Sequence, residues 1–248
     1  MDVDAVSPNV RVYVFASTEH LTPFDAVPRA VPYAQQLTNP LYNGPAFRAL
    51  AVALDRWVSE GAPPPASRVP RRADGTLVAP DAVAFPAIPA TRYGAWPPTP
   101  PARLNPATAK PIALLDLGET PPRVVEPAAY WAGVCQVDAD GNEVAGLRLP
   151  DVVAPIGTYA GWNPMPAGQG YPDNADMLGS FIPFATTRAE RLASDDPRLS
   201  LEERYGTQAG YVAAVEAAAR ALEAEELLLA EDRERIVAAA RARRVLPS

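Results

Sequence analysis

His20 is the only histidine among the 248 residues, and it follows a segment with the pattern of a β-strand. That segment, residues 10–16, carries valine, tyrosine and phenylalanine at close spacing, as strands do. A loop and then a strongly helical stretch come next. An imidazole held at the end of a strand can take the proton of a serine hydroxyl and return it to a leaving group. His20 is therefore a candidate catalytic base; the alternative is a loop histidine that only hydrogen-bonds to nearby backbone.

The nucleophile that such a base would activate is not recognisable in this sequence. None of the eight serines lies in the Gly-x-Ser-x-Gly motif, whose strained turn exposes a nucleophilic serine after a strand. Ser180 follows Gly179 and so has only half of that motif. Cys135, the only cysteine, could pair with His20 as a nucleophile, but a buried structural thiol in a predicted strand is the preferred interpretation. The sequence thus provides one part of a catalytic triad.

A resident metal or cofactor is not expected. With one histidine and one cysteine, the chain cannot supply a zinc site of the usual nitrogen and sulfur ligands, nor form a disulfide within itself. The string from Asp138 to Gly141 resembles part of a calcium loop. An EF-hand, however, needs a glutamate six residues after its glycine, where Leu147 stands. We interpret this string as a tight turn.

Composition argues against nucleic-acid binding and against a membrane span. The formal net charge is -7 and Lys110 is the only lysine, so no basic block is available to neutralise phosphates. No stretch approaches the ~20 apolar residues of a membrane-spanning helix. The acidic N-terminus lacks the apolar core of a secretory signal. We therefore expect no nucleic-acid or membrane partner, and a cytoplasmic location by default.

The clearest predicted element is a helix that begins at Pro45 and ends before Gly61. Proline suits the first helical position, Asn43 or Gly44 can cap the start, and glycine suits the residue after the end. The apolar residues of this helix recur with the helical period and form one stripe, which we expect to be buried. They are Phe47, Leu50, Ala51, Leu54, Trp57 and Val58.

Proline dominates the middle of the chain. There are 30 prolines, more than twice the usual share of about 5%. Most lie between Pro63 and Pro172, which predicts turns and extended segments because proline lacks the N–H that helices and sheets need. We expect this region to wrap a neighbouring surface through Phe85, Ile88, Tyr93 and Trp96. The alternative is a proline-rich ligand for a partner domain of the SH3 type.

The rest of the chain predicts a hairpin, an irregular segment and helices. A β-hairpin is predicted at about residues 134–153, around the Asp-Gly turn. Residues 156–184 are rich in glycine, asparagine and aromatic residues, so they either line a pocket or pack irregularly on the core. C-terminal helices are predicted at about residues 200–243, where Ser200 and Glu203 form a capping box.

Three groups of residues resemble one family. The first is N-V-R-V-Y at residues 9–13 with T-E-H at residues 18–20. The second is residues 50–57 and 61–68 with A-D-G-T-L at residues 73–77. The third is D-A-D-G-N-E-V-A-G at residues 138–146, L-P-D at 149–151, Y-A-G-W-N at 159–163 and G-S-F-I-P-F at 179–184. From about Val10 to the C-terminus, the chain resembles the C-terminal part of the large bacterial alpha/beta hydrolase domain proteins, which are esterase-like.

The resemblance implies an α/β fold of which this chain holds the C-terminal portion. Residues 1–62 would supply the last strand, the histidine loop and the last helix of an α/β-hydrolase core. Residues 63–248 would form a proline-rich appendage with the β-hairpin and the C-terminal helices. His20 takes the place of the catalytic histidine. Where the family often has Gly-Thr-Gln-His, this chain has S-T-E-H, and Glu19 would raise the imidazole pKa if its carboxylate turns toward the ring.

The resemblance further implies part of a serine hydrolase acting on carboxylic esters. This chain would supply the base, while the nucleophile and the acid lie upstream. The substrate would be a small-molecule ester, no cofactor would be needed, and the partner would be the upstream hydrolase half or a partner subunit. We expect the isolated chain to be inactive and, without that partner, to expose the apolar faces of residues 10–15 and 47–58, which favours association. The alternative is a non-catalytic interaction or scaffold module that complements another subunit.

Overall fold

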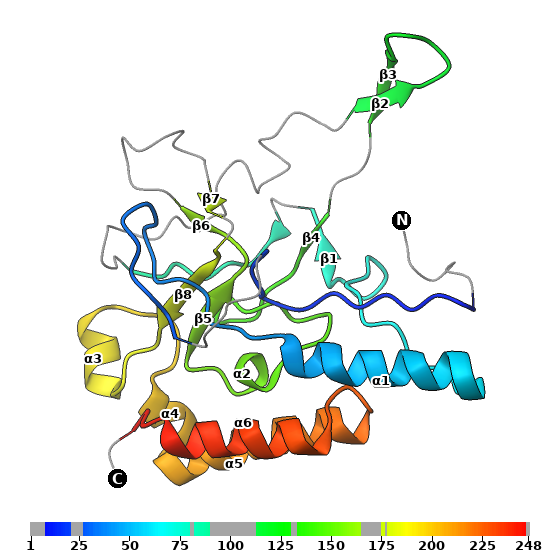
Figure 1. The fold of residues 1–248 in the computed structure, drawn as a ribbon. Coiled ribbons are helices and arrows are strands. Elements are labelled where there is room, and N and C mark those ends of the chain that lie inside the picture. The colour runs from blue at the N-terminus through cyan, green and yellow to red at the C-terminus, as the bar shows by residue number, and fades with distance from the viewer. Residues whose placement is uncertain are drawn as a thin grey trace.

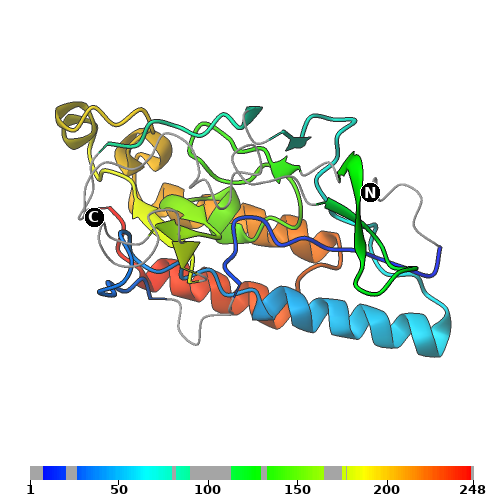
Figure 2. The ribbon, with the colours of Figure 1, turned by 90° about the horizontal axis from the view of Figure 1, so that it is seen from above.

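The computed structural model describes residues 8–20, 27–79, 82–89, 113–129, 133–164, 175–176 and 178–246, with both helices and strands. The helices are α1 (Gly44–Glu60), α2 (Pro150–Val153), α3 (Arg188–Ala193), α4 (Leu201–Tyr205), α5 (Gln208–Ala224) and α6 (Ala230–Ala242). Figure 1 shows α5 and α6 side by side beneath β5 and β8, and Figure 2 shows α1 extending beyond them. No helix in the described ranges is long and apolar enough to cross a membrane.

The described strands are short and pair in twos. They are β1 (Leu77–Val78), β2 (Ala113–Asp116), β3 (Arg123–Ala129), β4 (Val134–Cys135), β5 (Gly157–Ala160), β6 (Asn163–Pro164), β7 (Ala175–Asp176) and β8 (Ser180–Pro183). The antiparallel pairs are β1–β4, β2–β3, β5–β8 and β6–β7. All four residues of β5 are buried, so the β5–β8 pair lies in the interior.

Residues 10–16, predicted as a strand, are extended but form no regular ladder. The Val14 amide donates to the Arg68 carbonyl at 2.9 Å, and the Ala16 amide donates to the Leu147 carbonyl at 3.1 Å. Single parallel bridges join the segment to these two neighbours. The segment that leads to His20 is therefore held on both sides by stretches distant in sequence.

Helix α1 begins and ends close to the predicted residues, but it buries a different face. Its buried residues are Pro45, Ala46, Ala49 and Ala53. The prediction that the apolar stripe is buried is wrong, since Phe47, Leu54 and Val58 are 52%, 55% and 81% exposed. Alanine side chains are small, so this face of the helix can approach the α5–α6 corner closely. There Leu227 and Leu228 are buried in one cluster with Ala46.

One apolar cluster joins the beginning of the chain to its end. Its buried members are Ala46, Leu147, Leu149, Ala219, Leu222, Leu227 and Leu228. Tyr13 and Phe15, from the extended segment, pack against it. Residues 1–62 and residues 63–248, the two predicted parts, thus both contribute side chains to this cluster.

The β-hairpin predicted at about residues 134–153 is corrected by the structure. The turn itself is closed, with the Asp138 amide donating to the Asn142 carbonyl at 2.8 Å. The arms then separate: β4 pairs with β1, and Leu147 pairs with the extended segment. Beyond it, Pro150 begins α2, because proline suits a first helical position. The second arm is therefore not a continuous strand.

The C-terminal helices carry the predicted start signal. The Ser200 hydroxyl accepts from the Glu203 amide at 3.2 Å, and the Glu203 carboxylate accepts from the Ser200 amide at 3.0 Å. The capping box at α4 is therefore confirmed. Thr187 and Glu190 form a second one, which begins α3.

Part of the proline-rich region packs as predicted. Ile88 is buried against Ile182, and the Phe85 ring centroid lies 5.7 Å from that of Trp162. Tyr93 and Trp96 lie outside the described residues. The described part of this region therefore covers the β5–β8 pair.

Candidate functional site

His20 is the last residue of a turn that follows the extended segment, which we call the histidine loop (residues 17–20). The imidazole side chain is exposed, whereas Ala16 and Ser17 are buried. The described structure thus places the predicted base at the surface. Another molecule, or another part of the chain, could reach it there.

Ser17 gives the histidine loop its shape. Its φ is 60°, a left-handed conformation that costs a non-glycine residue energy and is held only by its surroundings. The Ser17 amide donates to the Glu143 carboxylate at 2.7 Å, and the Glu143 amide donates to the Ser17 hydroxyl at 2.9 Å. These reciprocal hydrogen bonds fix the turn three residues before His20.

Glu143 and Cys135 form a half-buried polar pair behind this turn. Burial raises the pKa of Glu143, and the hydrogen bonds that it accepts from the Ser17 amide and the Cys135 thiol oppose that rise. Burial and the Glu143 carboxylate raise the pKa of Cys135 to about 12. A thiol in this state carries almost no thiolate near neutral pH, so Cys135 is a poor nucleophile. The buried-thiol interpretation is supported over a Cys–His pair.

Buried asparagine side chains hold the histidine loop to the β5–β8 pair. The asparagines that are almost completely buried are Asn39, Asn142 and Asn163. Asn39 Nδ2 donates to the Ser17 carbonyl at 2.7 Å and to the Ala160 carbonyl at 3.0 Å. Asn163 Nδ2 donates to the Gly179 carbonyl at 2.7 Å. A satisfied buried network of this kind rigidifies the backbone that it joins.

Two glycines let other segments approach the histidine loop closely. A Cβ on Gly161 would lie 2.6 Å from the Thr18 carbonyl oxygen. At Gly179, whose φ is +60°, a Cβ would lie 2.5 Å from the Ala160 carbonyl oxygen and 3.0 Å from the Glu19 Cβ. Neither position has room for a side chain. The third group of family-like residues thus packs directly around the histidine loop.

Two described serines near the histidine loop have hydroxyl groups that form hydrogen bonds with the backbone. The Ser180 hydroxyl donates to the Trp162 carbonyl, and Ser180 is fully buried. Ser17 is 2% exposed, and its hydroxyl accepts the Glu143 amide. The half motif at Ser180 therefore serves packing.

The Asp-Gly string is a turn stabilised by its own carboxylate. Asp138 Oδ1 accepts from the Asp140 and Asn142 amides, both at 3.0 Å. Arg148 lies 3.3 Å from the other oxygen of Asp138. Across the described ranges, no group of three or more histidine, cysteine, aspartate or glutamate residues is arranged to hold a metal ion.

A cavity of about 260 Å³ adjoins the Glu143–Cys135 pair. Its wall is mostly apolar and includes Phe85, Tyr159 and Trp162. His20 is not among the residues that line it. Glu143 therefore contributes to this cavity wall and to the histidine loop at once.

Sequence reasoning proposed His20 as the base but missed the residues that hold its loop. Glu143 is 126 residues from Ser17, and nothing in the local pattern links them. The asparagines had a weak signal: two of them, Asn142 and Asn163, stand in the family-like strings. Asn39 lies outside those strings.

Comparison with known proteins adds one finding. A family model described as an alpha/beta hydrolase domain matches residues 2–238. No curated protein and no solved structure matches the chain.

Proposed function

Because the chain belongs to the alpha/beta hydrolase domain family, we propose that it supplies the catalytic base, His20, of a serine hydrolase acting on carboxylic esters. The observation that carries this proposal is an exposed imidazole on a loop fixed by buried hydrogen bonds and a strained Ser17. Strain held in place by a surrounding network is typical of functional sites. Membership of the family supports a hydrolase-like activity.

In this proposal the base works with a serine and a carboxylate from polypeptide outside this sequence. His20 takes the serine proton while the serine oxygen attacks the ester carbonyl, and it then protonates the departing alcohol. A water molecule, deprotonated by the same imidazole, releases the acid from the acyl-enzyme. The exposure of His20 supports a nucleophile that arrives from another polypeptide.

The exposed stripe of α1 supports such a partner. Phe47, Leu54 and Val58 lie seven and four residues apart, on one helix face, and all are exposed. The Phe15 and Phe47 ring centroids are 4.8 Å apart, so the stripe is continuous with the extended segment. Exposed apolar patches of this kind mark interaction surfaces. We propose that residues 1–62 join the remaining hydrolase core, which carries the nucleophile, across this surface, and that residues 63–248 form an appendage to that core.

Hydrolysis of p-nitrophenyl acetate tests the catalytic part. We expect no burst and no turnover from the isolated chain. Co-expression with the polypeptide encoded immediately upstream should yield esterase activity that His20→Ala abolishes and Ser59→Ala, on exposed α1 surface, leaves intact. A burst from the isolated chain, lost in His20→Ala, would show that the nucleophile lies in this sequence. A complex that is stable but inactive would favour the non-catalytic interaction module.

Size-exclusion chromatography tests the surface part. The isolated chain should associate in a concentration-dependent manner, because the apolar stripe of α1 is uncovered. The double variant Leu54→Glu, Val58→Glu should elute as a monomer, whereas Ser59→Glu, on the same helix but off the stripe, should behave like the original chain. A clean monomer of the original chain at every concentration would contradict a missing partner.

A further inference from the structure

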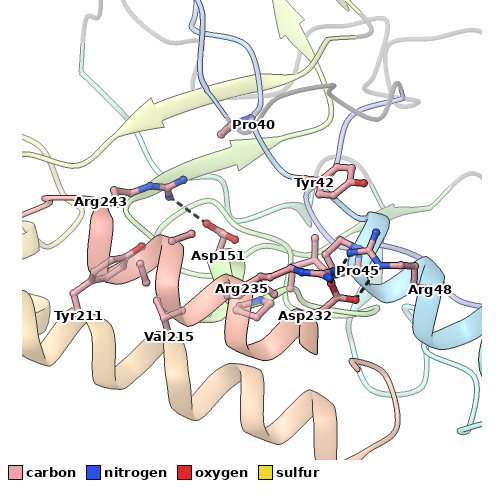
Figure 3. A pocket seen from close by; sticks show the side chains of 15 residues that line it. Pro40, Tyr42, Pro45, Arg48, Asp151, Tyr211, Val215, Asp232, Arg235 and Arg243 are labelled. Atoms are coloured by element: carbon pink, nitrogen blue, oxygen red, sulfur yellow. Dashed lines mark hydrogen bonds and ion pairs between the residues drawn. The ribbon is translucent and has the colours of Figure 1, made fainter. Parts of the chain in front are cut away.

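A second cavity, of about 240 Å³, is not lined by any residue of the histidine loop and has no role in the proposed function. It is bounded by residues 40–48, by the start of α2 and by faces of α5 and α6 (Figure 3). Its apolar wall consists of Pro40, Pro45, Leu149, Pro150, Val215, Ile236, Ala239 and Ala240. The charged side chains gather at its two ends (Figure 3).

At one end, two arginines share one buried aspartate. Arg48 binds the Asp232 carboxylate through two nitrogens, at 2.9 and 2.6 Å. Arg235 reaches the same carboxylate at 3.0 Å while remaining 68% exposed. Asp232 is 1% exposed, so its position is fixed. Two guanidinium charges on one carboxylate leave an excess of one positive charge at this end.

At the other end, Arg243 lies beside Asp151. The closest approach of the two side chains is 3.3 Å. Tyr211, almost completely buried, also lines this end. The Gln208 side chain donates to the Arg243 carbonyl at 2.8 Å and accepts from the Val245 amide at 3.0 Å. The backbone that carries Arg243 is thus held in place.

We propose that this cavity binds a small organic carboxylate with an apolar body. The lining holds three arginines and two aspartates, an excess of one positive charge, in a chain whose formal net charge is -7. One negative charge on the ligand balances that excess, whereas a dianion would be repelled by the aspartates. A guanidinium matches the two oxygens of a carboxylate. The volume exceeds the ~150 Å³ of an engineered cavity that admits benzene, so an aromatic ring fits.

Benzoate is the probe that tests this site, by calorimetric titration of the isolated chain. We expect saturable binding of benzoate, and at least tenfold weaker binding of benzamide, which keeps the shape without the charge. Arg235→Gln should weaken benzoate binding at least tenfold. Arg220→Gln, an exposed arginine on α5 outside the cavity, should change it less than twofold.

A steric variant separates the site from general charge effects. Ala239→Leu places a larger side chain into the cavity wall and should also weaken benzoate binding at least tenfold, while Ala238→Leu, which is exposed and outside the wall, should not. Equal binding of benzoate and benzamide would overturn the proposal. So would unchanged affinity in both Arg235→Gln and Ala239→Leu, or no saturable binding up to about 10 mM.

Discussion

Arg198→Ala is expected to lower the free energy of unfolding by about 3–5 kcal/mol, because it leaves a buried carboxylate without its partner. Arg198 is 3% exposed. Its guanidinium donates to both Asp196 oxygens, at 3.0 and 2.6 Å, and to Thr158 Oγ1 and the Ile182 carbonyl, both at 2.9 Å. It also lies 5.1 Å from the centroid of the Phe184 ring. One side chain thus joins the α3–α4 connection to the β5–β8 pair.

The loss of stability should depend on pH in a defined direction. Burial alone would raise the pKa of Asp196, but the hydrogen bonds and charge of Arg198 hold that pKa below its ordinary value of 3.8. A carboxyl whose pKa is lowered by folding stabilises the protein above the unfolded pKa, and that contribution is lost as the pH falls through the folded pKa. Arg198→Ala removes the side-chain hydrogen bonds and the charge of the guanidinium, while burial, the backbone amide of residue 198 and Arg191 still act on Asp196, so the pKa of Asp196 rises relative to the original chain. The destabilisation should therefore be larger at pH 7 than at about pH 4.

Urea unfolding followed by circular dichroism measures both effects. Arg220→Ala is the matched control, since Arg220 also binds a carboxylate, that of Glu216, at 2.7 Å but is 61% exposed. A surface pair of this kind contributes about 0–1 kcal/mol. Equal losses in the two variants would show that burial of the Arg198 pair is not what stabilises this region.

Gly179→Ala is expected to lower the free energy of unfolding by about 2–5 kcal/mol, from left-handed backbone strain together with overpacking. The added Cβ would meet the Ala160 carbonyl oxygen at 2.5 Å and the Asn39 Cβ at 2.9 Å. Both neighbours belong to the network that holds the histidine loop, so the loop must shift. The sole histidine makes this visible, because its imidazole gives the only histidine ring signals in an NMR spectrum.

Gly61→Ala separates backbone strain from steric contact. Gly61 has a φ of +72° and a ψ of 11°, a left-handed conformation, but a Cβ there meets nothing within 4 Å. Only the strain remains, about 1–2 kcal/mol, and the His20 signals should not move. If the two variants lose the same free energy of unfolding and have the same His20 signals, the close packing around the histidine loop does not contribute to stability.

The sequence predicted local structure better than it predicted which surfaces meet. Pro45, Gly61 and the Ser200 capping box carry start and stop signals that act within a few residues, and those elements formed. The periodicity of α1 showed which apolar residues share a face. It could not show that the alanine face with Ala46 would be buried instead, because that depends on the α5–α6 corner about 180 residues later.

The candidate site shows the same contrast between local signals and long-range contacts. His20 was predicted as the base because it is a lone histidine after a predicted strand, and the structure shows that it is exposed. The Glu143 carboxylate that holds the histidine loop could not be predicted. Its hydrogen bond from the Ser17 amide spans 126 residues and leaves no local sequence pattern. The hairpin prediction failed for a related reason: its second arm leaves the first and pairs at Leu147 with Phe15, far away in sequence, and the end of the predicted range is helix α2.

The raised pKa of the Cys135 thiol makes this chain convenient for labelling. With a pKa of about 12, its thiol ionises far less at about pH 8 than an ordinary cysteine, whose pKa is near 8.5. A cysteine introduced at Ser59, on the open side of α1, would then take up a maleimide fluorophore well before the native thiol. The dye would sit beside the apolar stripe, and a change in its emission would report the arrival of a binding partner in real time.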